Sequence, residues 1–512
     1  MTAVAQDTDA VYRQLLALDQ PCYVVRTAAG VGATADPRGH QVLAAVGPLT
    51  PEGLGDPAFR QAHGVGLAYH AGAMANGIAS AAMVVALARN GILGSFGAAG
   101  VLPDRVDEAI TTIKREAPGA PFAVNLIHAP SEAALERAVV DLCLKHEVRC
   151  VEASAFLDLT PQIVRYRAAG LVRTARGVEA RNRVIAKVSR AEVAEKFLRP
   201  APEALLRPLV EAGQLTAEQA ELAALVPMAD DITAEADSGG HTDRRPLVVL
   251  LPEIIAVRDR VRRELGLSSR VGVGGGIGTP VAASAAFGMG AAYVVTGSVN
   301  QACVEADQSE HAKRLLASAG VADCGMAPSS DMFELGVDVQ VLKRGTMFAG
   351  RAKKLYDLYR SHDGLESLGG TDRAELEQKV FRRPLDDVWA DCVSYFTARD
   401  PEQIRRAQDN PRRRMALVFR WYLGLSSGWS IRGVPERAAD YQIWCGPAMG
   451  AFNQWVAGTH LAAPGHRFVA DVATHLMRGA AFTTRVAQLR SAGVRLPAEC
   501  ATYPPSPSWE ER

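Results

Sequence analysis

The sequence has no excess of charge of either sign and no long apolar run. Its 512 residues include 56 basic and 56 acidic side chains, and this balance gives no indication of nucleic acid or an anionic membrane as a partner. No stretch of about eighteen uncharged apolar residues occurs, and residues 1–14 lack a basic region followed by an apolar core. We therefore expect a cytoplasmic protein with no membrane and no nucleic-acid partner.

Cysteine pairs with the spacing of metal ligands are absent as well. The eight cysteines are scattered, and no two of them form a C-x-x-C motif. This spacing argues against a zinc knuckle and against a disulfide framework, and it suits a reducing compartment. We predict no metal site.

A regular alternation of short apolar segments and amphipathic segments runs through the middle of the chain. Such an alternation is typical of a parallel sheet with crossover helices. The expected strands are 66–73, 93–98, 121–127, 149–156, 183–188, 230–237, 270–276 and 292–298. The helices expected between them include 81–89, 132–146, 254–265 and 281–288. Eight strands favour an α/β fold of the closed (β/α)8 TIM barrel type over an open doubly wound sheet.

Three regions do not follow this alternation. Residues 1–65 contain proline, glycine and short β-like runs, which predicts a small N-terminal β-rich cap. Residues 190–228 are expected to form a helical insertion after the fifth strand. Residues 369–512 are aromatic and basic without strand alternation, which predicts a helical C-terminal domain. The barrel would then cover residues 66–368, and the hydrophobic content of 48% is enough for its core.

The most informative segment is Val271–Gly278, with the sequence VGVGGGIG, and its counterpart one helix later is Tyr293–Ser298. Each segment has the pattern of a β-branched strand followed by glycine and the start of a helix. We therefore expect N–H groups from two adjacent turns to bind one phosphate. Neither a G-x-G-x-x-G fingerprint nor a Walker loop is present. The pair fits strands seven and eight of a barrel. The alternative is that Gly274, Gly275 and Gly276 only permit tight packing.

Polar side chains at the expected carboxyl ends of the strands are candidates for an active site. Charged residues within apolar strands are costly unless they are paired, and Lys187 is the clearest case. Its alternative is an outward-facing lysine, and the alternative for Glu152 is a buried hydrogen-bonding partner. His241 follows two glycines and acidic neighbours, which favours a titrating proton donor over a structural histidine. The other candidates are Met74, Asn76, Asn125, Glu235 and Asp237.

Several separated motifs resemble the PfaD-type trans-acting enoyl reductases of polyketide and polyunsaturated fatty acid synthases. The motifs occur in order and extend over nearly the whole chain. They are AGAMANGIAS at 71–80, GSFGAAG at 94–100, DDITAEADSGGH at 230–241, GGGIGTP at 274–280, VTGSVNQ at 295–301 and WCGPAMGAFN at 444–453.

The resemblance implies an FMN-containing barrel of the nitronate monooxygenase superfamily that reduces the α,β double bond of an acyl chain on an acyl carrier protein. NADPH would supply the hydride, with NADH as the alternative. The implied catalytic residues are His241, beside the substrate, and Lys187, a cation near the flavin. The implied cofactor-binding residues are Met74, Ala75, Asn76, Asn125, Lys187, Glu235, Asp237, Gly240, Gly274, Gly275, Gly276, Thr296, Gly297 and Ser298.

Two other functions compete with enoyl reduction. One is a flavin oxidase or monooxygenase that acts on nitronates, and the other is a non-catalytic synthase component. The expected helical C-terminal domain and the whole-chain resemblance favour the reductase over the oxidase. The intact glycine and histidine motifs disfavour the non-catalytic component. The sequence leaves open whether the chain forms a homodimer.

Two further motifs lie in the C-terminal part. Residues 424–428 fit G-x-S-x-G but lack the preceding apolar strand of a nucleophile elbow, which argues against a serine hydrolase. An arginine cluster either forms a solvated helical face or docks the acidic helix of a carrier protein, and we favour docking. Its members are Arg405, Arg406, Arg412, Arg413 and Arg414.

Overall fold

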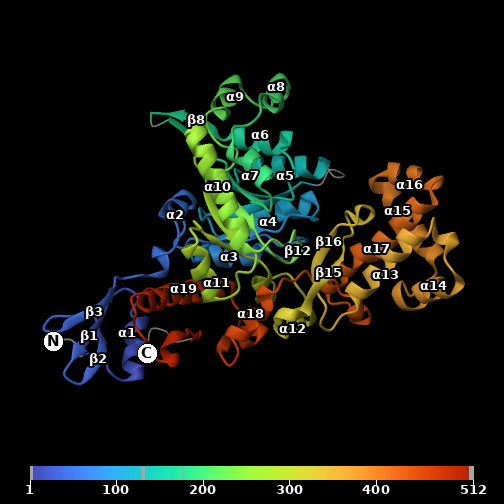
Figure 1. The fold of residues 1–512 in the computed structure, drawn as a ribbon. Coiled ribbons are helices and arrows are strands. Elements are labelled where there is room, and N and C mark those ends of the chain that lie inside the picture. The colour runs from blue at the N-terminus through green and yellow to red at the C-terminus, as the bar shows by residue number, and fades with distance from the viewer. Residues whose placement is uncertain (1–3, 129–132, 176, 507–512) are drawn as a thin grey trace. The chain divides into compact units, whose positions relative to one another are not determined.

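The computed structural model describes residues 4–128, 133–175 and 177–506 of the chain (Figure 1). These residues pack into two compact units. The first, called the barrel unit, comprises residues up to 237, residues 244–307 and residues from 451 onward. The second, called the helical unit, comprises residues 238–243 and 308–450. Among the described residues, no helix combines the length and the apolar character needed to cross a bilayer.

Eight parallel strands close into a barrel in the order β10-β11-β13-β14-β4-β5-β6-β7. All eight expected strands are present, so the predicted TIM barrel is confirmed. Their bounds are β4 Tyr69–Ala71, β5 Leu93–Phe96, β6 Ala123–Ile127, β7 Cys150–Ser154, β10 Arg183–Val188, β11 Asp231–Glu235, β13 Arg270–Gly274 and β14 Val294–Thr296. Most are shorter than expected because the residues at their ends already turn away from the ladder.

Helices follow the strands and cover the outside of the barrel (Figure 1). Their bounds are α3 Ala81–Arg89, α4 Pro103–Glu116, α5 Ala133–Lys145, α6 Pro161–Ala169, α7 Ala191–Leu198, α10 Leu247–Leu265 and α11 Pro280–Gly288. The four expected helices are confirmed. Only α10 begins well before its expected start at 254, and Pro252 lies inside the helix.

The expected β-rich cap is an antiparallel sheet in the order β2-β1-β3. Its strands are β1 Cys22–Thr27, β2 Gly30–Thr34 and β3 Gln41–Val46, and helices α1 Thr8–Leu16 and α2 Pro57–His63 flank it in sequence. The long helix α19, Val469–Ser491, belongs to the same unit. Its buried Arg485 donates to five carbonyl groups of the cap, those of Leu15, Ala17, Leu18, Gln20 and Gly47. This buried guanidinium ties the two ends of the chain together.

The expected insertion at 190–228 contains the barrel helix α7 followed by two additional helices, α8 Glu203–Glu211 and α9 Ala217–Ala223. A hairpin, β8 Leu171–Thr174 with β9 Gly177–Ala180, precedes β10. The helical character of the insertion is therefore confirmed, although its first helix is a regular member of the barrel.

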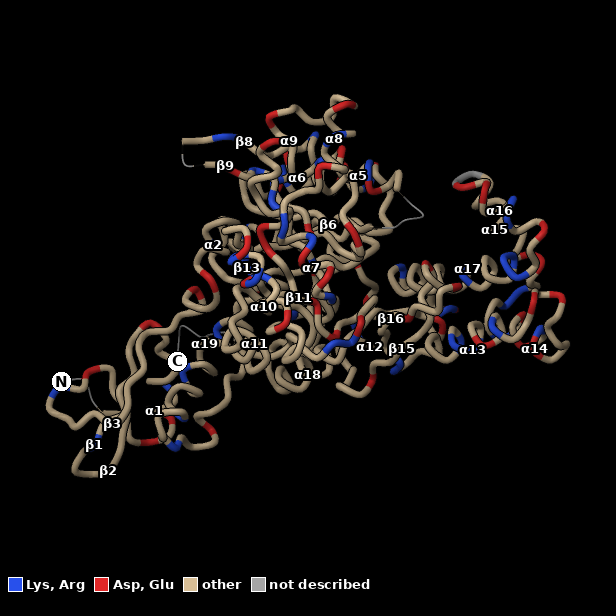
Figure 2. The backbone as a smooth tube through the Cα atoms, turned by 45° about the horizontal axis from the view of Figure 1, so that its top comes forward, with Lys and Arg blue, Asp and Glu red and all other residues tan. Residues whose placement is uncertain are grey.

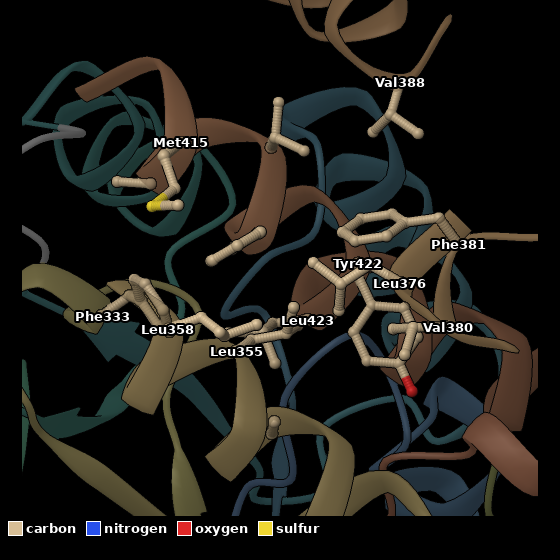
Figure 3. Packing of buried hydrophobic residues seen from close by; sticks show 14 of the residues in the cluster. Phe333, Leu355, Leu358, Leu376, Val380, Phe381, Val388, Met415, Tyr422 and Leu423 are labelled. Carbon is tan, nitrogen blue, oxygen red and sulfur yellow. The ribbon is translucent and has the colours of Figure 1, made fainter. Parts of the chain in front are cut away.

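The helical unit contains a small sheet in the order β12-β16-β15 and a set of helices. The elements are α12 Glu310–Ala317, β15 Cys324–Pro328, β16 Asp338–Leu342, α13 Phe348–Ser361, α14 Gly370–Glu375, α15 Leu385–Arg399, α16 Pro401–Gln408 and α17 Pro411–Arg432, with β12 at Gly240–His241. α18, Ala448–Trp455, spans the boundary to the barrel unit. Figure 3 shows part of the core, in which Phe381 and Tyr422 lie near Leu376 and Val380.

The compact units do not divide at the predicted boundaries. Residues 308–368 pack with 369–450, because the apolar face of α13 completes the core formed with α15 and α17. Residues from 451 onward pack with the barrel. The division into 1–65, 66–368 and 369–512 stays a prediction about separately folding parts. The G-x-S-x-G segment lies inside α17, where the Ser426 hydroxyl donates to the Tyr422 carbonyl over 2.7 Å, so it is no nucleophile elbow.

Candidate functional site

The carboxyl ends of the eight parallel strands meet at one rim of the barrel, which we term the mouth. β13 and β14 are neighbours there, with Gly274 in register beside Val295. The residues that follow, 275–276 and 296–297, therefore leave the sheet side by side. The structure thus brings the two glycine turns together, as the sequence predicts.

The glycines of these turns have different surroundings. A Cβ atom at Gly274 would lie 3.3 Å from the Val295 Cβ atom, and one at Gly275 would lie 2.6 Å from a carbonyl group of the loop after β11. These two glycines permit close packing. Nothing lies within 4 Å of a Cβ atom at Gly276 or Gly297. In the described part of the chain the N–H groups of these last two donate no hydrogen bond, so both can bind an anion.

The turn after β4 has a fixed backbone. Asn76 adopts a left-handed conformation with φ of 57°, which asparagine tolerates better than most residues. Its N–H donates to the Ala99 carbonyl of the turn after β5 over 2.7 Å. Met74 and Ala75 are half-buried on the same turn. Main-chain bonds rather than a ligand therefore define the position of these three candidate residues.

A buried polar layer inside the barrel supports this turn. The Glu152 carboxylate on β7 accepts the N–H of Ala73 over 2.8 Å. Its Oε2 atom also lies 3.6 Å from Nε2 of His70 on β4, which in turn contacts the Ser95 hydroxyl at 2.8 Å. Nδ1 of His70 is buried and has no partner among the described residues. Glu152 is thus a buried hydrogen-bonding partner, the alternative that the sequence left open, and His70 and Ser95 are site residues that sequence reasoning missed.

The charges in this layer are interdependent. Burial raises the pKa of Glu152, but the positive charges of His70 and Lys187 outweigh burial and leave that pKa below its usual value. Burial lowers the pKa of His70, and the charge of Glu152 opposes this only in part. The structure therefore favours an ionised Glu152, which Lys187 and the Ala73 N–H group both stabilise.

Lys187 and Glu235 form an ion pair at the mouth, with 3.0 Å between Nζ and Oε1. Lys187 is the last residue but one of β10, and Glu235 is the last residue of the neighbouring strand β11. Burial lowers the pKa of Lys187, but the charges of Glu235 and Glu152 raise it by more, so the pKa lies above its usual value. The lysine is therefore paired and protonated, and the alternative of an outward-facing lysine does not hold.

The remaining candidates at the mouth are held by the protein itself. Asn125 donates to the Ser154 hydroxyl over 2.9 Å and to the Glu152 carbonyl over 3.0 Å. The buried Thr296 hydroxyl bonds to Tyr69 and accepts from Asn300 Nδ2, the latter over 2.9 Å. The Thr296 side chain is therefore engaged within the protein.

Two candidates remain at the loop ends of β11 and β14. The N–H of Asp237 donates to the Arg245 carbonyl over 3.0 Å, and Ser298 begins a short 3-10 turn directly after Gly297. Thr279 caps α11 just beyond the glycine turn by accepting the N–H of Ala282 over 3.2 Å. The adjoining helix start adds positive partial charge to this part of the mouth.

Gly240 and His241 belong to the helical unit. They form β12, which pairs with β16. The exposed His241 places Nε2 3.1 Å from Oδ1 of Asp331. Burial raises the pKa of Asp331, but the hydrogen bond and charge of His241 lower it by more, to below its usual value. The histidine therefore lies beside an ionised carboxylate.

The arginine cluster is largely engaged within the helical unit. Arg413 pairs with Glu334 at 3.0 Å, and Arg414 pairs with Glu366 and Asp386, both at 3.3 Å. Arg405 and Arg406 both pair with Glu402, and Arg412 lies over the Tyr359 ring. Basic and acidic positions are intermixed along α15, α16 and α17 in Figure 2. These pairs reduce the positive charge that the cluster offers to a carrier protein.

Family models match three parts of the chain. The model described as nitronate monooxygenase matches residues 70–332, which include the barrel strands and the glycine turns. The model of the fatty acid synthase subunit PfaD N-terminal domain matches residues 2–47. The model of the inserted helical domain of [acyl-carrier-protein] S-malonyltransferase matches residues 362–441.

The chain is similar to components of biosynthetic synthases. It is 48% identical over 492 residues to one of the polyunsaturated fatty acid synthase subunits of Thraustochytrium sp., an alignment that covers 93% of this chain and 33% of that protein. It is 46% identical to the polyketide biosynthesis protein PksE of Bacillus subtilis, covering 84% of this chain and 56% of PksE. The chain thus spans between a third and just over half of these two relatives.

A solved structure is similar over most of its length. The enoyl reductase domain of MlnA, from the macrolactin biosynthesis cluster of Bacillus amyloliquefaciens, matches with a TM-score of 0.82 and 37% sequence identity. The match covers 86% of this chain and 99% of that domain. The resemblance found in the sequence motifs is therefore confirmed.

Proposed function

The chain belongs to the nitronate monooxygenase family, and from this premise we propose that it is an FMN-dependent enoyl reductase that uses NADPH and acts on enoyl chains carried by an acyl carrier protein. The observation that carries the proposal is the pair of adjoining glycine turns at the mouth, where Gly276 and Gly297 offer unengaged N–H groups. The similarity to an enoyl reductase domain and to synthase components supports the reaction and its setting.

The residues at the mouth fit FMN. Gly276 and Gly297, with Ser298, would hold the phosphate, because their turns are open where a side chain would otherwise stand. Met74, Ala75 and Asn125 would line the isoalloxazine ring from the ends of β4 and β6. When bound, FMN supplies a hydride relay between the nicotinamide and the β-carbon of the enoyl thioester.

Lys187 contributes a fixed positive charge. Its ion pair with Glu235 holds the ammonium group in place, and Glu152 lies close enough to stabilise the same charge. A protonated lysine at the mouth stabilises negative charge that develops on a neighbouring ring or carbonyl oxygen. Glu152 also fixes the turn after β4 through the Ala73 N–H. It acts as a positioning residue.

His241 would donate the proton that completes the reduction. As the β-carbon gains hydride, negative charge develops toward the thioester oxygen, and the imidazolium delivers a proton to the α-carbon. Asp331, whose Oδ1 atom lies 3.1 Å from Nε2, holds the imidazole ring in position for this step. The neutral histidine is then reprotonated by solvent, which its exposed position allows.

A spectrum and an anaerobic assay test the proposal. The purified chain should be yellow and release FMN on denaturation, and it should oxidise NADPH without oxygen when a but-2-enoyl chain on an acyl carrier protein is present. His241→Gln should bind FMN normally and lose reduction of the double bond, whereas His466→Gln, an exposed histidine elsewhere, should behave as the parent. A colourless protein, or full activity in His241→Gln, would contradict the proposal.

Nitronate oxidation is a second candidate, because the matching family model carries that description. An oxidase of this kind needs oxygen and a nitronate, and neither is needed for enoyl reduction. Turnover of a nitronate only in the presence of oxygen, with no anaerobic oxidation of NADPH by the enoyl substrate, would favour this candidate.

A further inference from the structure

Three side chains that can ligate a metal converge in the barrel unit. Asp471 and His475 lie one turn apart on the same face of α19. His460 comes from the short turn His460–Ala462 that precedes this helix. Nε2 of His460 is 2.8 Å from Oδ2 of Asp471, and Nε2 of His475 is 3.3 Å from Oδ1. One ligand atom from each residue lies within 4.8 Å of the other two.

The surroundings orient the imidazoles toward a common point. The Tyr503 hydroxyl contacts Nδ1 of the buried His475 at 2.9 Å, which leaves Nε2 of that ring directed at Asp471. When this Nδ1 donates its hydrogen to Tyr503, the lone pair of Nε2 is free for a metal. Nδ1 of His460 is buried and has no partner within the described ranges.

A hydrogen-bonded triad without metal is the competing explanation. In that case both imidazoles donate to one carboxylate, and charge-assisted bonds of this kind are usually about 2.7–2.9 Å long. The His475 contact is longer, at 3.3 Å. Two imidazole nitrogens and one carboxylate oxygen are instead a ligand set typical of zinc, with metal–ligand distances of about 2.0–2.2 Å.

Space beside the triad would admit a fourth ligand. A cavity of about 490 Å³ adjoins His460 and is also lined by Tyr12, Gly458, Arg478 and Tyr503. A water molecule could therefore complete a tetrahedral site from this side. The nearby Arg478 guanidinium opposes a further positive charge, so we expect weaker binding than at a fully enclosed structural zinc site.

We propose that His460, Asp471 and His475 bind one divalent transition-metal ion of the zinc class. Bound metal would join α19 to the turn before it. Through Tyr503, whose side chain lies against this helix, it would also secure the segment around that residue. The proposal does not depend on the reaction at the barrel mouth.

Zinc titration of the full-length flavoprotein, after removal of metal with a chelator, tests the site. Calorimetry should give one zinc ion per chain, and the midpoint of thermal unfolding should rise with zinc. His460→Gln, at a half-buried position, should abolish both effects. Tyr503→Phe should weaken zinc binding by about 10–100-fold, because partners behind a ligating histidine tune it by that factor. His466→Gln, in an exposed turn shortly before the start of α19, should match the parent.

Circular dichroism and flavin content show whether His460→Gln is folded. Loss of zinc binding in this variant can therefore be separated from loss of folding. No stoichiometric binding by the parent would overturn the proposal. Undiminished binding by a folded His460→Gln would overturn it too. If His460→Gln does not fold, the Tyr503→Phe variant decides alone, and an unchanged zinc affinity there would also reject the site.

Discussion

Charged groups at the two ends of the barrel differ in how fully their hydrogen-bonding atoms are paired. At the base, where the strands begin, the Asp231 carboxylate accepts from Arg270 over 2.6 and 2.8 Å and lies 2.8 Å from His63. Both of its oxygens are satisfied and no solvent reaches it. In the buried layer below the mouth, Nδ1 of His70 has no partner among the residues described, and the Lys187 pair at the mouth is partly open to solvent. A network in which every polar atom has a partner stabilises a fold, whereas a network with unpaired polar atoms can bind a ligand.

Asp231→Asn should produce the largest effect, and the effect should be on stability. Removing the charge of the buried Asp231 leaves the half-buried Arg270 beside a neutral group, and breaking a buried pair in this way typically costs about 3–5 kcal/mol. Urea unfolding of the parent and variant would measure the loss. Asp36→Asn is the matched control, because Asp36 also pairs with an arginine but at the surface, and it should change stability little. Similar losses of stability in the two variants would show that the pairing of Asp231 at the bottom of the barrel does not stabilise the barrel.

Much of the barrel could be predicted because each strand is apolar and each helix amphipathic. β10 has the bounds expected from Val184–Val188 and its flanking arginine. The compact units could not be predicted, because packing of α13 against α17 depends on contacts between segments far apart in the sequence. The expected start of α10 at 254 is wrong. Pro252 lies inside the helix and does not end it.

The site could be predicted only in part, for a related reason. Glycine at the ends of β13 and β14 is a local signal, and so is a lysine in an apolar strand. The inward direction of His70 and Ser95 is not a local signal, because strands that are buried on both faces show no alternation. The spacing of Asp471 and His475 is a detectable i, i+4 pair, but His460 joins them only through the fold.

Lys187→Met should lower turnover strongly and stability only a little, the reverse of what we expect for Asp231→Asn. Loss of one preorganised charge that stabilises a transition state typically lowers turnover by about 100–1000-fold. Stability should fall less than in Asp231→Asn, because Glu235 can be hydrated at the mouth. Anaerobic turnover and urea unfolding measured side by side would check both. Lys196→Met, which removes an exposed lysine paired with Asp158, should keep the parental turnover, and equal losses in both lysine variants would remove the role of Lys187.

Gly276→Ala should weaken FMN binding with a smaller effect than the loss of Lys187. The residue has φ of +76°, which alanine resists, so the N–H group would turn away from the phosphate. A hydrogen bond to a charged group contributes about 1.5–3 kcal/mol, so affinity should fall by about 10–100-fold. Gly213→Ala is the matched control, since Gly213 has φ of +67° and equally open surroundings away from the mouth. Fluorescence titration with FMN would separate local strain from loss of the phosphate contact.

The smallest effect on stability should appear when the Asp231 network at the bottom of the barrel is titrated with acid. Burial raises the pKa of Asp231, but His63 and Arg270 lower it by more, to below its usual value. The group therefore contributes stability at pH values above the unfolded pKa of about 3.9 and loses that contribution as the pH falls through the folded value. The stability difference between the parent and Asp231→Asn should narrow as the pH falls below about 4. Each unit by which the pKa is lowered corresponds to about 1.4 kcal/mol of this difference. A difference that does not narrow below about pH 4 would mean that the Asp231 carboxylate is not held in its ionised form by its two partners.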